Sequence, residues 1–249
     1  MRLEGNTVVI TGGSTGIGFA LAERLVKLGN EVVICGRSEE KLKAAVEKLP
    51  SVHTLSADIS KDEGRRRLFE FVTTKFKGTN VLVNNAGIQR HIDFRKGIVD
   101  LLKNEDEIEI NFRSQIYLSA MFIPVLMKQK DPAIVNVSSG LGFAPLAAFP
   151  VYSATKAGIH SFTVSLRRQL RDTEIKVFEV VPPMVYDTGL KGKPIEKTEW
   201  SISAAEMADA IIEGLENDVY EMAAGASKNF LSASKRDLDK AFEDMNRRF

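Results

Sequence analysis

Two short stretches of the sequence carry residues whose types and spacing could do chemistry. Residues 9–18, VITGGSTGIG, place a serine among glycines, and residues 151–158, VYSATKAG, place Tyr152 and Lys156 four residues apart. The first stretch has two interpretations. Residues 12–16 fit G-x-S-x-G, the strained turn that exposes a nucleophilic serine in α/β-hydrolases. The same glycines also fit a turn that lets a phosphate reach the start of a helix.

The positions of the histidines distinguish these two interpretations. A hydrolase of this kind needs an acidic residue and then a histidine after the serine. The histidines are His53, His91 and His160, and none lies in the last third of the chain. His53 falls in a predicted strand and His160 in a predicted helix, where packing is the ordinary role. We therefore favour the phosphate interpretation, in which Ser14 is a neighbour of a bound dinucleotide and not a nucleophile.

Tyr152 and Lys156 would lie on one face of a helix, because side chains four residues apart are neighbours on a helical surface. One Tyr-x-x-x-Lys arises by chance in such a chain roughly one time in four, so the spacing alone proves little. The position of the pair is more informative. It follows AIVNVSS at residues 133–139, an apolar run that ends in two serines. Ligands of open α/β sheets bind beyond the carboxyl ends of the strands, so a hydroxyl group there is well placed for chemistry.

The elements that would position these residues alternate along the chain. Helical stretches include FALAERLVKLGN, which ends at Gly29, and SEEKLKAAVEKL, which Ser38 can cap. The strand candidates are nearly all apolar, as in strands covered on both faces. The alternation predicts one domain over residues 1–249, a Rossmann-type doubly wound parallel sheet with helices on both faces. The strand candidates are TVVIT near 7, EVVIC near 31, VHTLS near 52, NVLVN near 80, AIVNVSS near 133, IKVFEVV near 175 and, with the weakest pattern, VYEMAA near 219.

Composition excludes several classes of protein. The chain has 249 residues, of which 44% are hydrophobic and 27% charged, as in a soluble globular protein and unlike a disordered one. The net charge of +1 gives no electrostatic case for binding nucleic acid or a membrane. Cys35 is the single cysteine, so no internal disulfide can form and a reducing compartment fits. There is no signal-like segment, and no apolar run approaches the roughly 18 residues that cross a bilayer. We expect a cytoplasmic protein.

Taken together, the motifs resemble those of the short-chain dehydrogenase/reductase family. TGGSTGIG from Thr11, NNAG from Asn84, SSGLG from Ser138 and YSATK from Tyr152 occur in the order and spacing of that family, and the resemblance covers the chain to about residue 190. VNNAGIQR, YLSAMFIPVLMKQ and VVPPMV resemble the DltE-type oxidoreductases within it. The resemblance implies an NAD(P)-dependent oxidoreductase that transfers a hydride between NADP(H) and a carbonyl or alcohol substrate.

The same resemblance implies a catalytic set of four residues. Tyr152 matches the acid/base that exchanges a proton with the substrate oxygen, and Lys156 matches the lysine whose charge lowers the tyrosine pKa and which bonds the nicotinamide ribose. Ser139 matches the serine that polarises the substrate oxygen. Ser138 is one position off and is expected to cap backbone groups at the strand end instead. Asn111 matches the helix asparagine that holds a water linking the lysine to solvent.

The resemblance implies a dinucleotide cofactor and no metal. NAD-dependent relatives carry an acidic residue at the end of the second strand, where it binds the ribose 2′-hydroxyl. Here Gly36 is followed by Arg37, whose guanidinium suits a 2′-phosphate, so NADP(H) is expected over NAD(H). Glu39 and Glu40 are rival partners but should face solvent at a helix start. The residues expected to contact the cofactor are Gly12, Ser14, Thr15, Gly16, Ile17, Gly18, Arg37, Asp58, Ile59, Asn85, Ala86, Gly87, Tyr152, Lys156, Pro182 and Val185.

The substrate side departs from the family pattern. The family's Pro-Gly after the sixth strand is Pro182-Pro183, and its threonine arrives one residue late as Thr188, so a contact of Thr188 with the nicotinamide is left open. Residues 190–202 are expected to form a substrate lid, with a plain surface loop as the alternative, and residues 225–249 a charged helical tail. The residues expected to line the substrate pocket are Gln89, Leu141, Phe143, Phe149, Met184 and Tyr186.

The sequence leaves two alternatives open, one for the oligomeric state and one for the function. Residues 107–127 and 152–171 match the helices that pair across a two-fold axis in the family, so a homodimer is expected and a homotetramer is left open. The expected partner is a small-molecule carbonyl or alcohol, with no nucleic acid and no membrane. A non-catalytic dinucleotide sensor or scaffold could use the same fold, because fold does not determine function. The presence of both Tyr152 and Lys156 favours the enzyme.

Overall fold

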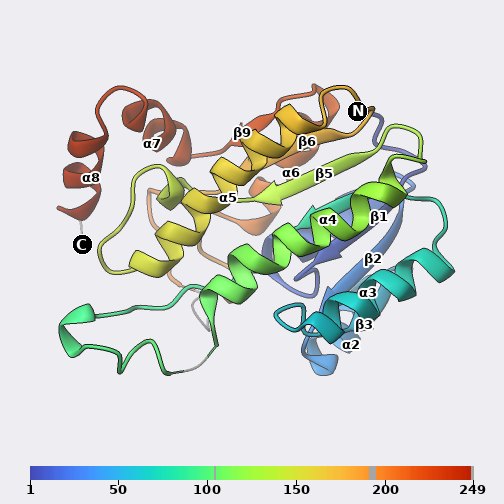
Figure 1. Cartoon of the computed structure of the whole chain (residues 1–249), viewed down its shortest axis with the longest axis horizontal. Coiled ribbons are helices and arrows are strands. Elements are labelled where there is room, and N and C mark those ends of the chain that lie inside the picture. Colours follow the sequence, from blue (N-terminus) through green and yellow to red (C-terminus); the bar gives the residue numbers. More distant parts are fainter. Residues whose placement is uncertain (104, 191–194, 248–249) are drawn as a thin grey trace.

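A seven-stranded parallel sheet forms the centre of the protein (Figure 1). The computed structural model describes residues 1–103, 105–190 and 195–247. Every strand expected from the sequence is present, and the Rossmann-type fold is confirmed. The sheet order is β3-β2-β1-β4-β5-β6-β9. Strands β2 and β3 are added on one side of β1, and β4 and the later strands on the other side. Open α/β sheets bind ligands at such a switch point, here between β1 and β4. The strands are β1 (Thr7–Thr11), β2 (Glu31–Gly36), β3 (His53–Ser56), β4 (Thr79–Asn84), β5 (Ala133–Val137), β6 (Lys176–Val181) and β9 (Glu221–Ala223).

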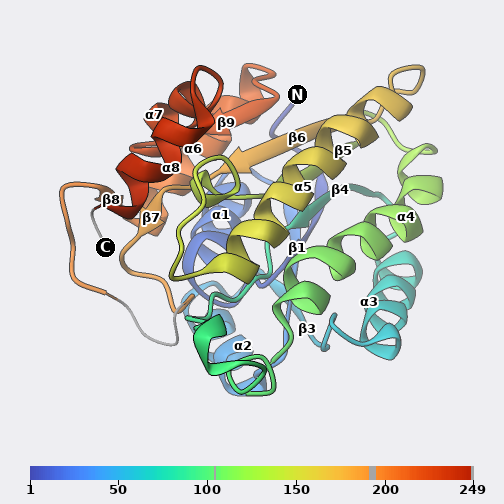
Figure 2. The same cartoon turned by 60° about the vertical axis from the view of Figure 1, so that its left-hand side comes forward.

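Helices cover both faces of the sheet (Figures 1 and 2). Val8 and Ile10 of β1 point into one core cluster and Val9 into the other, because side chains alternate across a strand. α1 (Gly16–Lys27), α2 (Glu39–Lys48) and α6 (Ala204–Glu216) cover the first face. α3 (Asp62–Lys75), α4 (Ser114–Leu126) and α5 (Pro150–Gln169) cover the second face. Burial on both faces explains why the strands are almost uniformly apolar.

The helix ends follow local sequence signals. The Ser38 hydroxyl accepts the Lys41 N–H at 3.2 Å and caps α2, as expected. Gly29 has a φ of +78° just after α1, a conformation that favours glycine. A reciprocal pair of hydrogen bonds between Ser203 and Glu206 starts α6.

Several elements depart from the expectations. A π-helix over Glu109–Arg113 precedes α4, so residues 107–127 do not form one regular helix. Two short strands, β7 (Met184–Val185) and β8 (Ser201–Ile202), pair outside the main sheet. Two-residue strands are too short to leave a pattern in the sequence.

The C-terminal segment folds back on the carboxyl ends of the strands. α7 (Ser227–Ser234) and α8 (Leu238–Asn246) lie within the expected helical tail, of which residues 248–249 fall outside the described part of the chain. α7 packs beside a 3₁₀ turn over Gly140–Gly142, at the end of β5 (Figure 1). No helix in the described ranges combines the length and the apolar character that crossing a membrane requires.

Candidate active site

A cavity of about 660 Å³ lies at the carboxyl ends of the strands, where the sheet order reverses. Its walls come from the turn after β1, the ends of β4 and β5, the start of α5, the segment after β6, and α7 and α8. The structure thus gathers residues that are far apart in the sequence. Of the residues expected at the cofactor, those lining the cavity are Gly12, Ser14, Thr15, Gly16, Ile17, Arg37, Asp58, Ile59, Asn85, Ala86, Gly87, Tyr152, Lys156, Pro182 and Val185.

The turn between β1 and α1 is built to receive an anion. Gly12 and Gly16 have φ values of +65° and +58°, and a Cβ on Gly12 would lie 2.8 Å from the Ala86 Cα. The Thr15 side chain makes no capping hydrogen bond, and the first turn of α1 has no acidic residue. The N–H groups at the helix start therefore remain available, as a phosphate requires. A dinucleotide fits this turn.

Gly18 supports the turn from behind and is not among the residues that line the cavity, and its contact with a cofactor stays a prediction. A Cβ there would lie 2.6 Å from the Gly12 carbonyl oxygen and 2.5 Å from the Asn85 Nδ2. Asn85 in turn donates to the carbonyls of Thr11 and Gly12 at 2.9 and 3.1 Å. Glycine is needed at position 18 because α1 and the β1 turn approach each other closely.

Tyr152 is a buried phenol at the start of α5. Burial raises its pKa to about 12, a hydrogen bond with Ser139 opposes that rise, and the charge of Glu107 adds to it. The Ser139 hydroxyl also accepts the Leu141 N–H at 3.2 Å, which orients it at the end of β5. The phenol therefore holds its proton at neutral pH, beside a hydroxyl group that faces the same cavity.

Lys156 lies one helical turn after Tyr152 and is 2% exposed. Its Nζ donates to the Val137 carbonyl at 2.7 Å and lies 5.6 Å from the centre of the Tyr152 ring. Burial lowers the pKa of Lys156 to about 8, so the ammonium form still predominates at pH 7. Burial dominates the pKa of Tyr152 in the protein alone, and the lowering of that pKa by Lys156 stays a prediction.

Asn111 is fully buried in the π-helix, a form of turn that is frequent at functional sites. Its amide exchanges two hydrogen bonds of 2.8 Å with the backbone of Ile88, and its Nδ2 also donates to the Thr155 hydroxyl at 3.3 Å. A Cβ on Gly87 would lie 3.3 Å from the Asn111 Oδ1 and 3.6 Å from the Lys156 Nζ. Asn111 thus holds the turn after β4 close to Lys156.

Ser138 lies among the residues that line the cavity, and its hydroxyl bonds within the sheet. Its hydroxyl donates to the Glu179 carboxylate at 2.6 Å and to the Val180 carbonyl at 3.2 Å. The carbonyl contact matches the expected backbone role. The contact with Glu179 is the shorter one and has no counterpart in the sequence expectations.

Two residues expected in the substrate pocket lie elsewhere. Gln89, Leu141, Phe149 and Met184 line the cavity, whereas Phe143 and Tyr186 do not. The 3₁₀ turn directs Phe143 toward α5, where its ring centre lies 4.4 Å from that of His160.

Tyr186 is held beside the β7–β8 pair by hydrogen bonds of its backbone with Ile202 and Ile195. The Lys197 ammonium lies 5.7 Å from the centre of the Tyr186 ring. Thr188 does line the cavity, and its hydroxyl donates to the Val185 carbonyl at 3.1 Å.

One wall of the cavity comes from segments whose role the sequence did not reveal. Ser227, Phe230 and Met245 of the C-terminal helices line it. The Ser227 hydroxyl is buried and has no hydrogen-bond partner among the described residues. A Cβ on Gly140 would lie 2.5 Å from that oxygen, so only a glycine at position 140 lets α7 pack this close to the cavity. No local sequence pattern predicts these contacts of α7 and α8 with the cavity, because they form only when the C-terminal segment folds back onto the sheet.

The residues expected to form a lid also reach the cavity. Within 190–202, residues 191–194 lie outside the described part of the chain. The residues on either side of that gap that line the cavity are Leu190, Ile195, Thr198 and Trp200. Three of these four side chains are apolar, so this part of the cavity wall is largely apolar.

The cavity mouth beside β2 carries positive charge. Arg37 and Lys41 both line it, and Arg37 forms an ion pair with Glu105 at the surface. Glu39 and Glu40 are exposed, as expected for the first turn of α2. Two cations and no free carboxylate from α2 suit a ribose 2′-phosphate, although Glu105 competes for one of them.

Comparison with known proteins agrees with this geometry. A family model described as short chain dehydrogenase matches residues 6–199. The chain is 49% identical over 249 residues to the uncharacterized oxidoreductase DltE of Bacillus subtilis, covering 99% of this chain and 98% of that protein. A Burkholderia cenocepacia short chain dehydrogenase in complex with NADP shares 27% identity with a TM-score of 0.81, covering 98% and 99% of the two chains. A Burkholderia phymatum short chain dehydrogenase/reductase in complex with NAD shares 20% identity with a TM-score of 0.84, covering 99% and 97%.

Proposed function

The chain belongs to the short-chain dehydrogenase family of oxidoreductases, and from that premise we propose that it transfers a hydride between NADP(H) and an apolar carbonyl or alcohol. The observation that carries the proposal is the convergence of Ser139, Tyr152 and Lys156 on one cavity, next to a glycine turn suited to phosphate. A bound nicotinamide dinucleotide supplies the hydride, and the protein supplies binding, orientation and proton transfer.

In the direction of reduction, Tyr152 acts as the proton donor. The phenol is neutral because burial raises its pKa to about 12, so the proton is present at Oη when a carbonyl oxygen arrives. Ser139 orients that oxygen from the end of β5. The buried ammonium of Lys156 gives the floor of the site a positive charge and a donor for ribose hydroxyls. Asn111 keeps the turn after β4 in place around Lys156.

The cavity walls indicate the class of substrate. Of the described residues that line it, those with a charged side chain are Arg37, Lys41, Asp58 and Lys156. The first three lie at the adenosine end, and Lys156 lies at the floor. The remaining wall is largely apolar, with Leu141, Phe149, Met184, Phe230 and Met245, and also carries the uncharged polar side chains of Gln89, Ser139, Thr198 and Ser227. An uncharged, largely apolar carbonyl compound suits this wall better than a carboxylate or a phosphate ester, since Lys156 at the floor is the one cation that the described residues offer there.

The proposed function is tested in two steps. A thermal-shift measurement with NADPH, with NADH and with buffer reports cofactor binding, because a ligand that binds only the native state raises its stability. A panel of neutral aldehydes and ketones of increasing chain length is then followed by NADPH absorbance. Turnover that rises with apolar chain length supports the proposal. Cofactor binding with no turnover on any compound of the panel would favour the sensor or scaffold instead.

We predict that NADPH binds at least about tenfold more tightly than NADH, because one charge-assisted contact with a phosphate contributes on the order of 1.5–3 kcal/mol. Arg37→Ala should remove most of that preference, and Glu105→Gln should increase it by releasing Arg37 from its ion pair. Fluorescence titration with both cofactors measures the affinities. Arg95→Ala is the matched control, since Arg95 is an exposed arginine paired with Asp93. Equal affinities in the unchanged protein would refute NADP(H) preference.

We also predict a homodimer through α4 and α5. Tyr117, Met127 and Val164 are large side chains on or beside these helices, and each is more than 40% exposed in the single chain. A closed two-fold pairing would bury them against a second copy. Light scattering at micromolar concentration should give at least twice the chain mass, and Val164→Glu should lower it. A monomer mass for the unchanged protein is the contrary result.

A further inference from the structure

A row of polar side chains crosses the sheet directly beneath the active site. Asn84 of β4, Asn136 of β5, Glu179 of β6 and Glu221 of β9 are neighbours in register on four adjacent strands. The interior strands of a parallel sheet are normally apolar on both faces, so such a row is unusual. Asn84 donates to Asn136, and Asn136 donates to Thr163 of α5 at 3.0 Å. The row therefore contacts α5, the helix that carries Tyr152 and Lys156.

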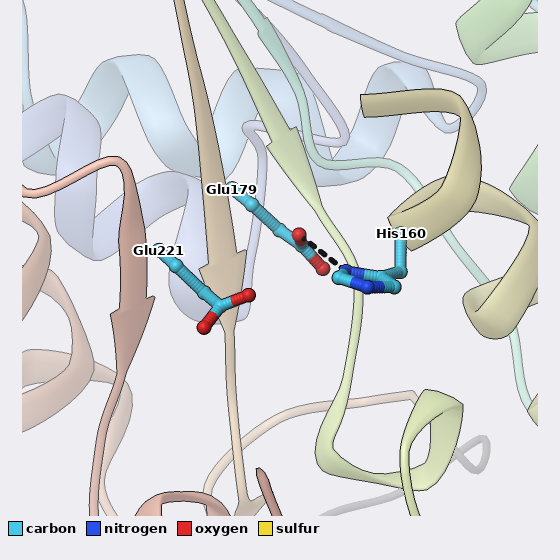
Figure 3. Close-up of side chains that lie close together, drawn as sticks. All are labelled: His160, Glu179 and Glu221. Carbon is cyan, nitrogen blue, oxygen red and sulfur yellow. Dashed lines mark hydrogen bonds and ion pairs between the residues drawn. The ribbon is translucent and has the colours of Figure 1, made fainter. Parts of the chain in front are cut away.

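Glu179 is the member of the row that joins two catalytic elements. Its side chain is fully buried. One carboxylate oxygen accepts the Ser138 hydroxyl at 2.6 Å, and the other lies 2.8 Å from the His160 Nδ1 (Figure 3). Ser138 precedes Ser139 at the end of β5. His160 follows Tyr152 and Lys156 by further helical turns, on the same face of α5.

The charges around Glu179 favour a protonated His160. Glu221 lies beside Glu179 on the next strand, and two adjacent carboxylates repel each other (Figure 3). The hydrogen bond with Glu179 raises the pKa of His160, partial burial lowers it, Glu221 raises it and Lys235 lowers it. Lys235 itself donates to Glu221 at 3.0 Å. A positive imidazolium compensates the buried carboxylate, which would otherwise be costly in this position.

The same three side chains have the spacing of a metal site, since their ligand atoms lie within 4.8 Å of one another. Their present partners favour a proton. Ser138 already occupies one oxygen of Glu179, and the Lys235 ammonium beside Glu221 would repel a divalent cation. The cluster is therefore better suited to a His–Glu ion pair than to a metal ion.

We propose that Glu179 and His160 are positioning residues that hold the end of β5 against α5 and so keep Ser139 in hydrogen-bonding reach of Tyr152. The inference rests on the proposed function. Ser138 is the link, because its backbone N–H and its hydroxyl both bind β6, at Val180 and Glu179. Loss of the charge on His160 weakens the bond that ties α5 to Glu179 on β6, while Ser138 stays bonded to β6, so α5 and the end of β5 can separate and Ser139 is displaced from Tyr152.

The positioning effect should depend on pH. The pKa of His160 is raised in the folded protein. The positive charge that positions Ser139 is therefore fully present below the ordinary pKa of a histidine, and it is lost as pH rises through the raised pKa. The ionisable groups that face His160 are Glu179 on β6, Glu221 on β9 and Lys235 after α7. The ratio of wild-type to His160→Asn turnover should therefore be largest at low pH and approach one at high pH. Taking the ratio cancels the titration of Lys156, which both proteins share.

Ser138→Ala tests the link with little change in volume. Turnover should fall roughly tenfold or more, because a displacement of about 1 Å of a positioned group costs up to about 10²-fold. The NADPH dissociation constant should change little, and the melting temperature should fall by only the few degrees that the loss of one buried hydrogen bond accounts for. Ser119→Ala is the matched control, since Ser119 is a buried serine bonded to Asn84 in the same row but far from Ser139 in the chain. Glu179→Gln should lower turnover at least as much as Ser138→Ala, whereas Glu221→Gln, which leaves both bonds of Glu179 in place, should have a smaller effect.

An NMR titration of the histidine rings tests the ion pair without any substrate. The His160 signal, assigned with His160→Asn, should titrate above the ordinary value of about 6.5 and return toward it in Glu179→Gln. A normal His160 pKa in the unchanged protein would overturn the inference. So would full turnover in Ser138→Ala while Tyr152→Phe is inactive. An active Tyr152→Phe protein would instead refute the proposed chemistry, whatever the histidine titration shows.

Discussion

Tyr152→Phe is expected to lose roughly 10²–10⁴-fold in turnover, the usual range for a positioned proton donor. The change removes one oxygen from a buried ring that fits the start of α5, so the fold should survive. NADPH affinity should change little, because the glycine turn and Arg37 line the phosphate end of the cavity and Tyr152 lies at its floor. Single-turnover NADPH oxidation with the best substrate of the carbonyl panel measures the loss.

Tyr220→Phe is the control for this experiment. Tyr220 is partly exposed, and its ring stacks on Phe178 at 5.1 Å, away from the cavity lining. It should keep full activity. If Tyr152→Phe were as active as the unchanged protein, the proton-transfer role would have to be abandoned, and Tyr152 and Lys156 would be an ordinary pair on a helix.

Lys156→Met is expected to lower both turnover and cofactor affinity. Methionine has a similar length but no charge, so the site loses its buried ammonium and a donor for the nicotinamide ribose. The effect on affinity distinguishes this variant from Tyr152→Phe. Fluorescence titration with NADPH and single-turnover kinetics measure the two losses separately.

The pH dependence of cofactor binding gives an independent check on Lys156. Burial lowers its pKa to about 8, so the ammonium is present below pH 8 and is lost as pH rises above it. NADPH affinity of the unchanged protein should therefore weaken above about pH 8, and this slope should be absent in Lys156→Met. A bound dinucleotide would favour the charged form and move the slope upward. Identical pH profiles for the two proteins would contradict a direct role of the ammonium in cofactor binding.

The sequence by itself determined the fold and the position of the glycine turn after β1. Apolar runs set the strands, and Gly29 and Ser38 set helix ends, because each of these signals acts within a few residues of the chain. The glycine turn could be identified for the same reason, since a turn and the start of its helix are local. Likewise, Tyr152 and Lys156 share a face of α5 because helical spacing is regular.

What only the tertiary structure decided involves contacts between distant segments. Phe143 turns toward His160 rather than the cavity, and the C-terminal helices bring Phe230 and Met245 to the cavity wall. Likewise, Glu179 and Ser138 meet because β5 and β6 pair in one particular register, which no pattern within either strand specifies. The raised pKa of Tyr152 also has this origin, because the burial that causes it comes from elements that are far apart in the chain.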